Sequence, residues 1–150
     1  MRRQAGEAFG HWLSQEHWDA LLTITDPGMS HPEAMLKQTR WFMNSVNRRL
    51  YGRKFYKRGE GIEYVIALER QKRGSVHSHS LIRLSDHALS NEIVRYMKDL
   101  TEQCSGWSRV EIPRSQLDTV NYVCKYVTKD GDLHLSDTYD PNSPRRFEGL

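Results

Sequence analysis

Cysteine is scarce in this chain of 150 residues, with Cys104 and Cys124 as its only two and no CxxC pair. That scarcity argues against a disulfide framework and against a four-thiolate zinc site. Long apolar runs are absent as well, since the mean hydropathy is −0.75 and no run approaches the roughly 18 residues that cross a bilayer. These absences exclude a membrane-spanning protein and favour reduced thiols in an intracellular protein.

Charge of either sign is nearly balanced, since 22 lysine and arginine residues face 19 aspartate and glutamate residues, a net charge of +3. So small an excess permits a nucleic-acid partner without establishing one. A secretory leader is missing, because residues 5–18 carry polar and charged side chains where an apolar segment is required. No GxxxxGK[ST] phosphate-binding loop is present, so we expect no helicase within this chain.

Strand and helix patterns alternate along the chain and predict one α+β domain over residues 1–139, followed by a C-terminal tail at 140–150. Apolar, β-branched runs predict strands, and helical spacing of apolar residues predicts helices. The expected strands are 21–25, 62–68, 75–84 and 107–112, and the expected helices are 30–52, 91–103 and 115–130. Because a short polar turn near Lys72 joins the second and third strands, we expect an antiparallel sheet with helices packed on it.

The first and third helices carry capping signals at their starts. Ser30 with Glu33 and Ser115 with Asp118 each have the spacing of a capping box. In the third helix, four apolar residues form one stripe that we expect to face the core: Leu117, Val120, Cys124 and Val127.

Two tyrosines and two lysines lie off this stripe, on another face of the third helix. At about 100° per residue, Tyr122 and Tyr126 point away from the stripe, close to Lys125 and Lys129. The simpler interpretation is a solvated face with ordinary aromatic residues. The functional interpretation is a nucleophilic phenol, because nearby positive charge favours the phenolate and lysine contacts phosphate directly.

A strand with alternating faces carries two histidines. His77 and His79 lie two residues apart and therefore project from the same side of the sheet. The simpler interpretation is a pair of exposed strand histidines. Glu69 lies across the short turn from His77 and would complete a site of two imidazoles and one carboxylate, with Glu63 as the alternative third ligand. Such a set with open positions fits a divalent ion that also binds a substrate oxygen.

Three segments in this order resemble the HUH endonucleases, the replication initiators and relaxases that nick single-stranded DNA. Leu22–Asp26 resembles the first motif of rolling-circle replication initiators, Val76–Ser80 the metal motif, and Tyr122–Lys129 the catalytic motif. The doubled Tyr-x-x-Lys-Tyr-x-x-Lys is similar to the paired-tyrosine initiators of small single-stranded DNA phages, viruses and plasmids. Ser78 departs from the family pattern, which has a bulky apolar residue between the histidines.

The resemblance implies an antiparallel sheet of about five strands and a Mn²⁺ or Mg²⁺ ion held by His77, His79 and Glu69 against the scissile phosphate. It implies attack by Tyr122 or Tyr126, assisted by the two lysines of the motif, to give a 5′-phosphotyrosine link and a free 3′-OH. Two tyrosines would allow alternating use during rolling-circle replication. It further implies a virus- or plasmid-encoded protein of the host cytoplasm that acts on origin DNA with the host helicase and polymerase.

Cations and aromatic rings are interleaved in one segment, which favours binding of a single strand through phosphate contacts and base stacking. This segment, 47–58, contains Tyr51, Phe55 and Tyr56 and no acidic residue. The candidate DNA-binding residues are Arg48, Arg49, Arg53, Lys54, Lys57 and Arg58, with Arg70, Lys72 and Arg73 in the hairpin turn. A solvated helix end is the simpler interpretation of the first group.

Three other functions compete with a replication initiator. A single-strand HUH transposase would use the same chemistry, and a non-catalytic nucleic-acid-binding module could carry an incidental zinc site. An iron oxygenase with two histidines and a carboxylate is disfavoured, because it does not need a helix face of tyrosine and lysine and the expected strands are too few for its usual double-sheet barrel.

Overall fold

The computed structural model describes residues 11, 13, 17–85, 87–130 and 133–138, without the side chains of 126–130. The elements in chain order are β1 (Ala20–Thr25), α2 (Pro32–Tyr51), the short 3₁₀ helix η1 (Phe55–Arg58), β2 (Glu63–Arg70), β3 (Val76–Arg83), α3 (Asn91–Gln103), β4 (Trp107–Glu111), α4 (Gln116–Asp130) and β5 (Leu133–Leu135). No helix in this part of the chain is long and apolar enough to span a bilayer.

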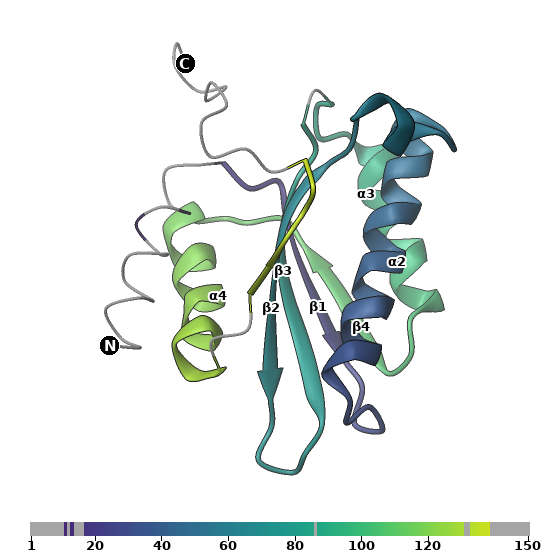
Figure 1. Cartoon of the computed structure of the whole chain (residues 1–150). Helices are drawn as coiled ribbons and strands as arrows, with labels where there is room; N and C mark the ends of the chain where they lie inside the picture. The colour runs from purple at the N-terminus through teal and green to yellow at the C-terminus, as the bar shows by residue number, and fades with distance from the viewer. Residues whose placement is uncertain (1–10, 12, 14–16, 86, 131–132, 139–150) are drawn as a thin grey trace.

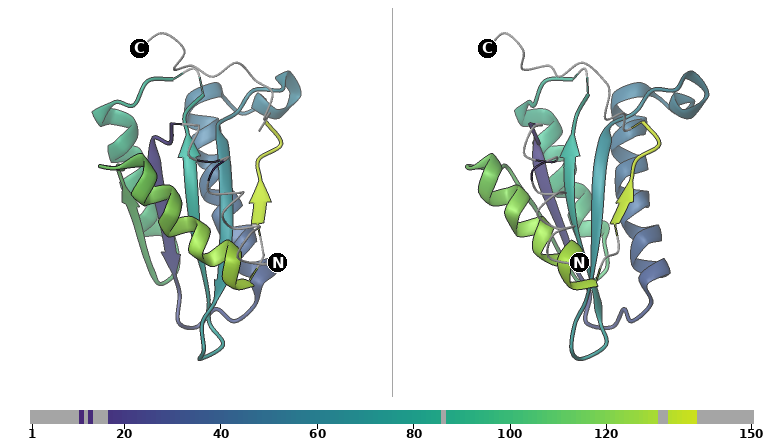
Figure 2. Two further views of the ribbon diagram at one scale, coloured as in Figure 1. Left: turned by 90° about the vertical axis from the view of Figure 1, so that its left-hand side faces the viewer. Right: turned by 60° about the vertical axis from the view of Figure 1, so that its left-hand side comes forward.

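The strands form one antiparallel sheet in the order β4-β1-β3-β2-β5. Helices α2 and α3 cover one face, and α4 crosses the other face obliquely, so the molecule has three layers (Figures 1 and 2). The predicted α+β class, with a five-stranded antiparallel sheet flanked by helices, is confirmed.

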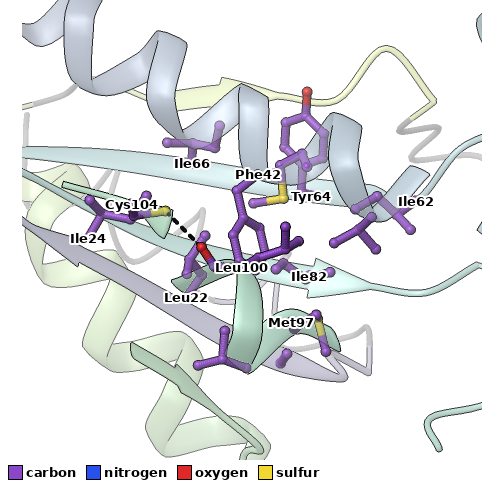
Figure 3. Packing of buried hydrophobic residues seen from close by; sticks show 14 of the residues in the cluster. Leu22, Ile24, Phe42, Ile62, Tyr64, Ile66, Ile82, Met97, Leu100 and Cys104 are labelled. Atoms are coloured by element: carbon purple, nitrogen blue, oxygen red, sulfur yellow. Dashed lines mark hydrogen bonds between the residues drawn. The ribbon is translucent and has the colours of Figure 1, made fainter. Parts of the chain in front are cut away.

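The larger core lies between the sheet and helices α2 and α3. Apolar residues at helical spacing on α2, such as Phe42 and Val46, meet alternate residues of the strands, such as Leu22. Figure 3 shows Phe42, Leu22 and Leu100 gathered in this layer. Burial of this apolar surface fixes which face of each strand points toward α2, and therefore also which residues project toward α4.

A smaller core joins α4 to the opposite face of the sheet. Val120, Val123 and Cys124 pack there against strand residues that include Leu81. The predicted stripe is wrong at Leu117, whose exposed fraction is 59%. Gln116 causes this rotation, because its amide bonds both the backbone N–H (2.7 Å) and the carbonyl (2.9 Å) of Trp18, which directs Leu117 outward.

One of the two predicted capping boxes is present. Ser115 Oγ accepts a hydrogen bond from Asp118 N at 3.2 Å, as expected at the start of α4. The box at Ser30 is wrong, because His31 is the N-cap of α2 and makes no side-chain cap hydrogen bond. Pro32 explains the shift, since its fixed φ and missing N–H suit the first helical position.

Gly106, which precedes β4, has a φ of +67° and lies against the end of β1. A Cβ on this residue would overlap the carbonyl oxygen of Thr25 and lie 2.7 Å from Asp26 Cα. We expect Gly106→Ala to lower the free energy of unfolding by more than the roughly 1 to 3 kcal/mol of backbone strain alone, as measured by urea denaturation. Gly59→Ala is the matched control, because Gly59 has a φ of +66° and no atom within 4 Å of a built Cβ. Equal losses in the two variants would contradict the close-contact explanation.

Candidate metal centre and the neighbouring tyrosine

The β2–β3 hairpin brings two histidines and a glutamate together. Its turn is closed by hydrogen bonds from Gln71 N to Ser75 O (2.8 Å) and from Gly74 N to Gln71 O (2.9 Å). This register places Glu69 directly opposite His77, and the strand period places His79 on the same face. One potential ligand atom from each of Glu69, His77 and His79 lies within 4.8 Å of the others.

Burial controls the protonation of this cluster. Glu69 and His79 are buried and His77 is half-buried. Removal from water, and secondarily the charge of His77, lower the pKa of His79 to about 4. The His79 ring is therefore neutral at pH 7, and its 3.9 Å approach from Nε2 to Glu69 Oε2 is a polar contact rather than an ion pair. A neutral imidazole is the form that binds a metal ion.

Gln71 is a part of this cluster that the sequence analysis missed. Its Nε2 donates a hydrogen bond to Glu69 Oε1 and lies 3.3 Å from Nδ1 of His77. The signal that could have revealed it is the strand period, because residue 71 shares the parity of residue 69 at the end of β2. Gln71 therefore bridges the carboxylate and one imidazole.

Glu63, the alternative third ligand, is wrong. It lies at the other end of β2, six residues and roughly 20 Å of strand from Glu69. Its Oε2 pairs with Arg83 Nη2 at 2.6 Å, and both side chains are buried. A buried carboxylate needs such a partner, so Glu63 is part of a structural ion pair.

Helix α4 places a tyrosine over the histidines. The rings of Tyr122 and His79 meet edge to face, with centroids 5.4 Å apart. The expectation that Tyr122 points away from the core is wrong, because its half-buried ring packs against the smaller core. Lys125 is exposed, and its Nζ lies 5.9 Å from the Tyr122 ring centroid, so the predicted proximity of these two residues is confirmed.

The second tyrosine and second lysine lie outside the described side chains. The structure gives the helical backbone of α4 to Asp130, which places residue 126 about one turn beyond Tyr122. The positions of the Tyr126 phenol and the Lys129 ammonium group therefore stay predictions. The tail predicted at 140–150 also lies outside the described residues.

The predicted DNA-binding cations fall into two separate groups. Arg70, Lys72 and Arg73 are exposed in or beside the hairpin turn, next to the histidine cluster. The residues of segment 47–58 lie at the far end of β2, where η1 precedes the strand (Figure 1). The structure therefore brings only the hairpin cations close to the cluster.

Two arginines of segment 47–58 have protein partners. Arg49 pairs with Glu92, and its guanidinium carbon lies 5.6 Å from the Tyr96 ring centroid. Arg58 bonds the carbonyl of Tyr51 and, at 3.1 Å, the carboxylate of Glu60. Arg48 also contacts Ser45 Oγ at 3.1 Å. All three side chains are on exposed residues, where such contacts contribute little stability.

Comparison with protein families gives one match, to the family of the replication-associated protein ORF2. The match spans residues 19–131, about three quarters of the chain, and runs from just before β1 to just after α4. It therefore contains the histidine cluster and the whole tyrosine-bearing helix. Comparisons with curated proteins and with solved structures give no match.

Proposed function

Because the chain belongs to the family of the replication-associated protein ORF2, we propose that it initiates replication by nicking single-stranded DNA at an origin through a tyrosine. The observation that carries this proposal is the ring of Tyr122 packed against His79 of the histidine cluster. A nucleophile beside a candidate metal site is the arrangement that transfer of a phosphoryl group requires.

Glu69, His77 and His79 would hold Mn²⁺ or Mg²⁺. Their mutual separation of at most 4.8 Å fits an ion bound at about 2.1 Å from each atom after a small inward movement. The neutral His79 ring and the carboxylate supply the required lone pairs. When bound, the ion would act as a Lewis acid that polarises a phosphate oxygen and offsets charge in the transition state.

The covalent step conserves one phosphodiester bond. The phenol of Tyr122 or Tyr126 loses its proton to solvent, and the phenolate oxygen attacks the scissile phosphorus. The bond from phosphorus to the 3′ oxygen breaks, and that oxygen takes up a proton to become a free 3′-OH. The phosphotyrosine retains the bond energy, so a 3′-OH can later reverse the attack and rejoin the strand without ATP.

The cations near the tyrosine support this chemistry electrostatically. Lys125 would stabilise the Tyr122 phenolate or the phosphate that it attacks, and Lys129 would do the same one turn later. Arg70, Lys72 and Arg73 would contact phosphates next to the cut. The 3′-OH product would be extended by a host polymerase behind a host helicase.

The direct test is formation of a covalent adduct. The protein is incubated with single-stranded DNA carrying the origin and with Mn²⁺, then analysed on a denaturing gel, and the modified peptide is identified by mass spectrometry. We expect a retarded band that needs a divalent ion and maps to Tyr122 or Tyr126. DNA binding without an adduct under any divalent ion would overturn the catalytic proposal and indicate a binding module.

Gln71 provides a milder test of the metal site. Gln71→Ala removes the amide that bridges Glu69 and His77, so the ligands lose orientation while all three remain. Loss of such an outer partner typically lowers metal affinity about 10- to 100-fold. We expect this loss for Mn²⁺ in isothermal titration calorimetry, with Gln38→Ala as the control because Gln38 bonds Ser105, away from the cluster. Unchanged affinity in Gln71→Ala would show that the bridge does not orient the ligands.

A further inference from the structure

The sheet face that carries the histidines continues across two more strands. In the register, Trp107 of β4 pairs with Thr25, which pairs with His77. One step along, Arg109 pairs with Thr23, which pairs with His79. Paired residues in antiparallel strands project from the same face, so an aromatic ring and a guanidinium lie in line with the candidate metal ligands.

This part of the sheet is open to solvent in the described part of the chain. Helix α4 packs mainly on β2 and β3, and its oblique path leaves the start of β4 and the end of β1 uncovered (Figure 2). Trp107 has an exposed fraction of 74%, the highest among the large apolar side chains described. Burial in the protein therefore does not explain a tryptophan at this position.

A shallow hollow accompanies the exposed ring. It has a volume of about 330 Å³ and is lined by Thr23, Thr25, Trp107, Ser108 and Arg109. This size is at the lower end of the roughly 300 to 1,000 Å³ typical of ligand pockets. The lining combines one stacking surface, one cation and hydroxyl groups, which suits a base with its phosphate better than an apolar protein surface.

We propose that Trp107 and Arg109 form a binding subsite for one unpaired base and its phosphate, on a single strand that crosses β4 and β1 to the histidine cluster. This inference rests on the proposed function, because it names where that substrate lies. The base stacks on the Trp107 indole, and Arg109 contacts a phosphate, while Thr23 and Thr25 offer hydroxyls between them and the histidines.

Distances along the sheet set the place of this base relative to the cut. Two steps between neighbouring strands, each about 4.8 Å, separate Trp107 from His77 by roughly 10 Å. At about 3.4 Å per stacked nucleotide, this corresponds to about three nucleotides, and to fewer in an extended strand. The stacked base is therefore close to the scissile phosphate, whereas segment 47–58 can contact only more distant nucleotides.

Arg109 is available for a phosphate despite a neighbour of opposite charge. Its Nε lies 3.5 Å from Glu111 Oε1, and the exposed side-chain fractions are 70% and 44%. Exposed pairs of this kind are worth little. A phosphate can therefore replace the carboxylate at small cost.

The test measures binding of fluorescein-labelled oligo(dT) by fluorescence anisotropy. We expect Trp107→Ala to raise the Kd about 5- to 150-fold, the loss of one base–aromatic stack, and Trp107→Phe to retain most of the affinity. Arg109→Ala should reduce the slope of log Kd against log salt by about 0.7, the contribution of one phosphate on a single strand. Trp41→Ala is the matched control, because Trp41 is exposed on α2, on the other side of the sheet.

Three outcomes overturn the subsite. These are an unchanged Kd in Trp107→Ala, an equal loss in Trp41→Ala, and an equal loss of binding to blunt duplex DNA, whose bases are already stacked. Adduct formation by the unaltered protein is measured in parallel. If the adduct forms but Trp107→Ala binds normally, only the subsite is wrong, whereas absence of both adduct and oligo(dT) binding rejects the proposed function itself.

Discussion

Changing both Tyr122 and Tyr126 to phenylalanine is expected to abolish the covalent adduct while DNA binding persists. Phenylalanine keeps the ring that packs beside His79 but lacks the oxygen that would attack phosphorus. Loss of a nucleophile costs up to about 10⁶-fold in kcat in a well-studied hydrolase, so the expected adduct is below detection. The measurements are adduct yield on a denaturing gel and Kd for oligo(dT).

The single variants distinguish one nucleophile from two. Tyr122→Phe and Tyr126→Phe should each leave some adduct, because either phenol can attack in the paired-tyrosine scheme. Tyr56→Phe is the control, since this exposed tyrosine lies in η1 at the far end of β2. If one single change removes all of the adduct, the scheme with two nucleophiles is wrong and the other tyrosine is at most a helper.

Replacing His77 or His79 with alanine is expected to have the second large effect. Each change removes one of three candidate ligands, so Mn²⁺ affinity should fall by more than the roughly 100-fold that loss of an outer partner can cause. Adduct formation should be lost with the metal, whereas oligo(dT) affinity should change little because Trp107 and the cations remain. Calorimetry with Mn²⁺, the adduct assay and anisotropy measure the three quantities.

A structural role for the histidines predicts a different pattern. His79 is buried against Tyr122, so its removal also creates a cavity and lowers the melting temperature. His87→Ala is the control, because His87 packs edge to face on Tyr51 with centroids 4.8 Å apart and lies far from the cluster in the sequence. Equal loss of metal binding and DNA binding, in proportion to lost stability, would favour folding over catalysis.

Local patterns were sufficient to predict most elements of this fold. The hairpin, α3 and the start of α4 lie where alternation, helical spacing and the Ser115 cap placed them. The strand β5 was missed because Leu133–Leu135 is only three residues long and pairs with β2, far away in the sequence. No local period is detectable in so short a segment.

Long-range packing decided what the sequence left open at the site. Glu63 and Glu69 share one face of β2, and only the hairpin register shows that Glu69 faces His77. The helical wheel placed Tyr122 away from the core because it assumed that Leu117 faces inward, whereas the bonds of Gln116 to Trp18 rotate the helix. The alignment of Trp107 with His77 depends on pairings of β4 with β1 and of β1 with β3, which no local pattern reveals.

The placement of all candidate ligands on one hairpin has a consequence for the order of folding. Glu69, Gln71, His77 and His79 lie within eleven residues, so closing this loop costs little chain entropy. Tyr122 must be brought in from 43 residues beyond His79, and Trp107 reaches its row only when β4 joins β1. Because local contacts form before distant ones, we expect a chain emerging during synthesis to acquire its ion-binding hairpin early and its nucleophile late. An incompletely folded chain would then bind metal without being able to cut DNA.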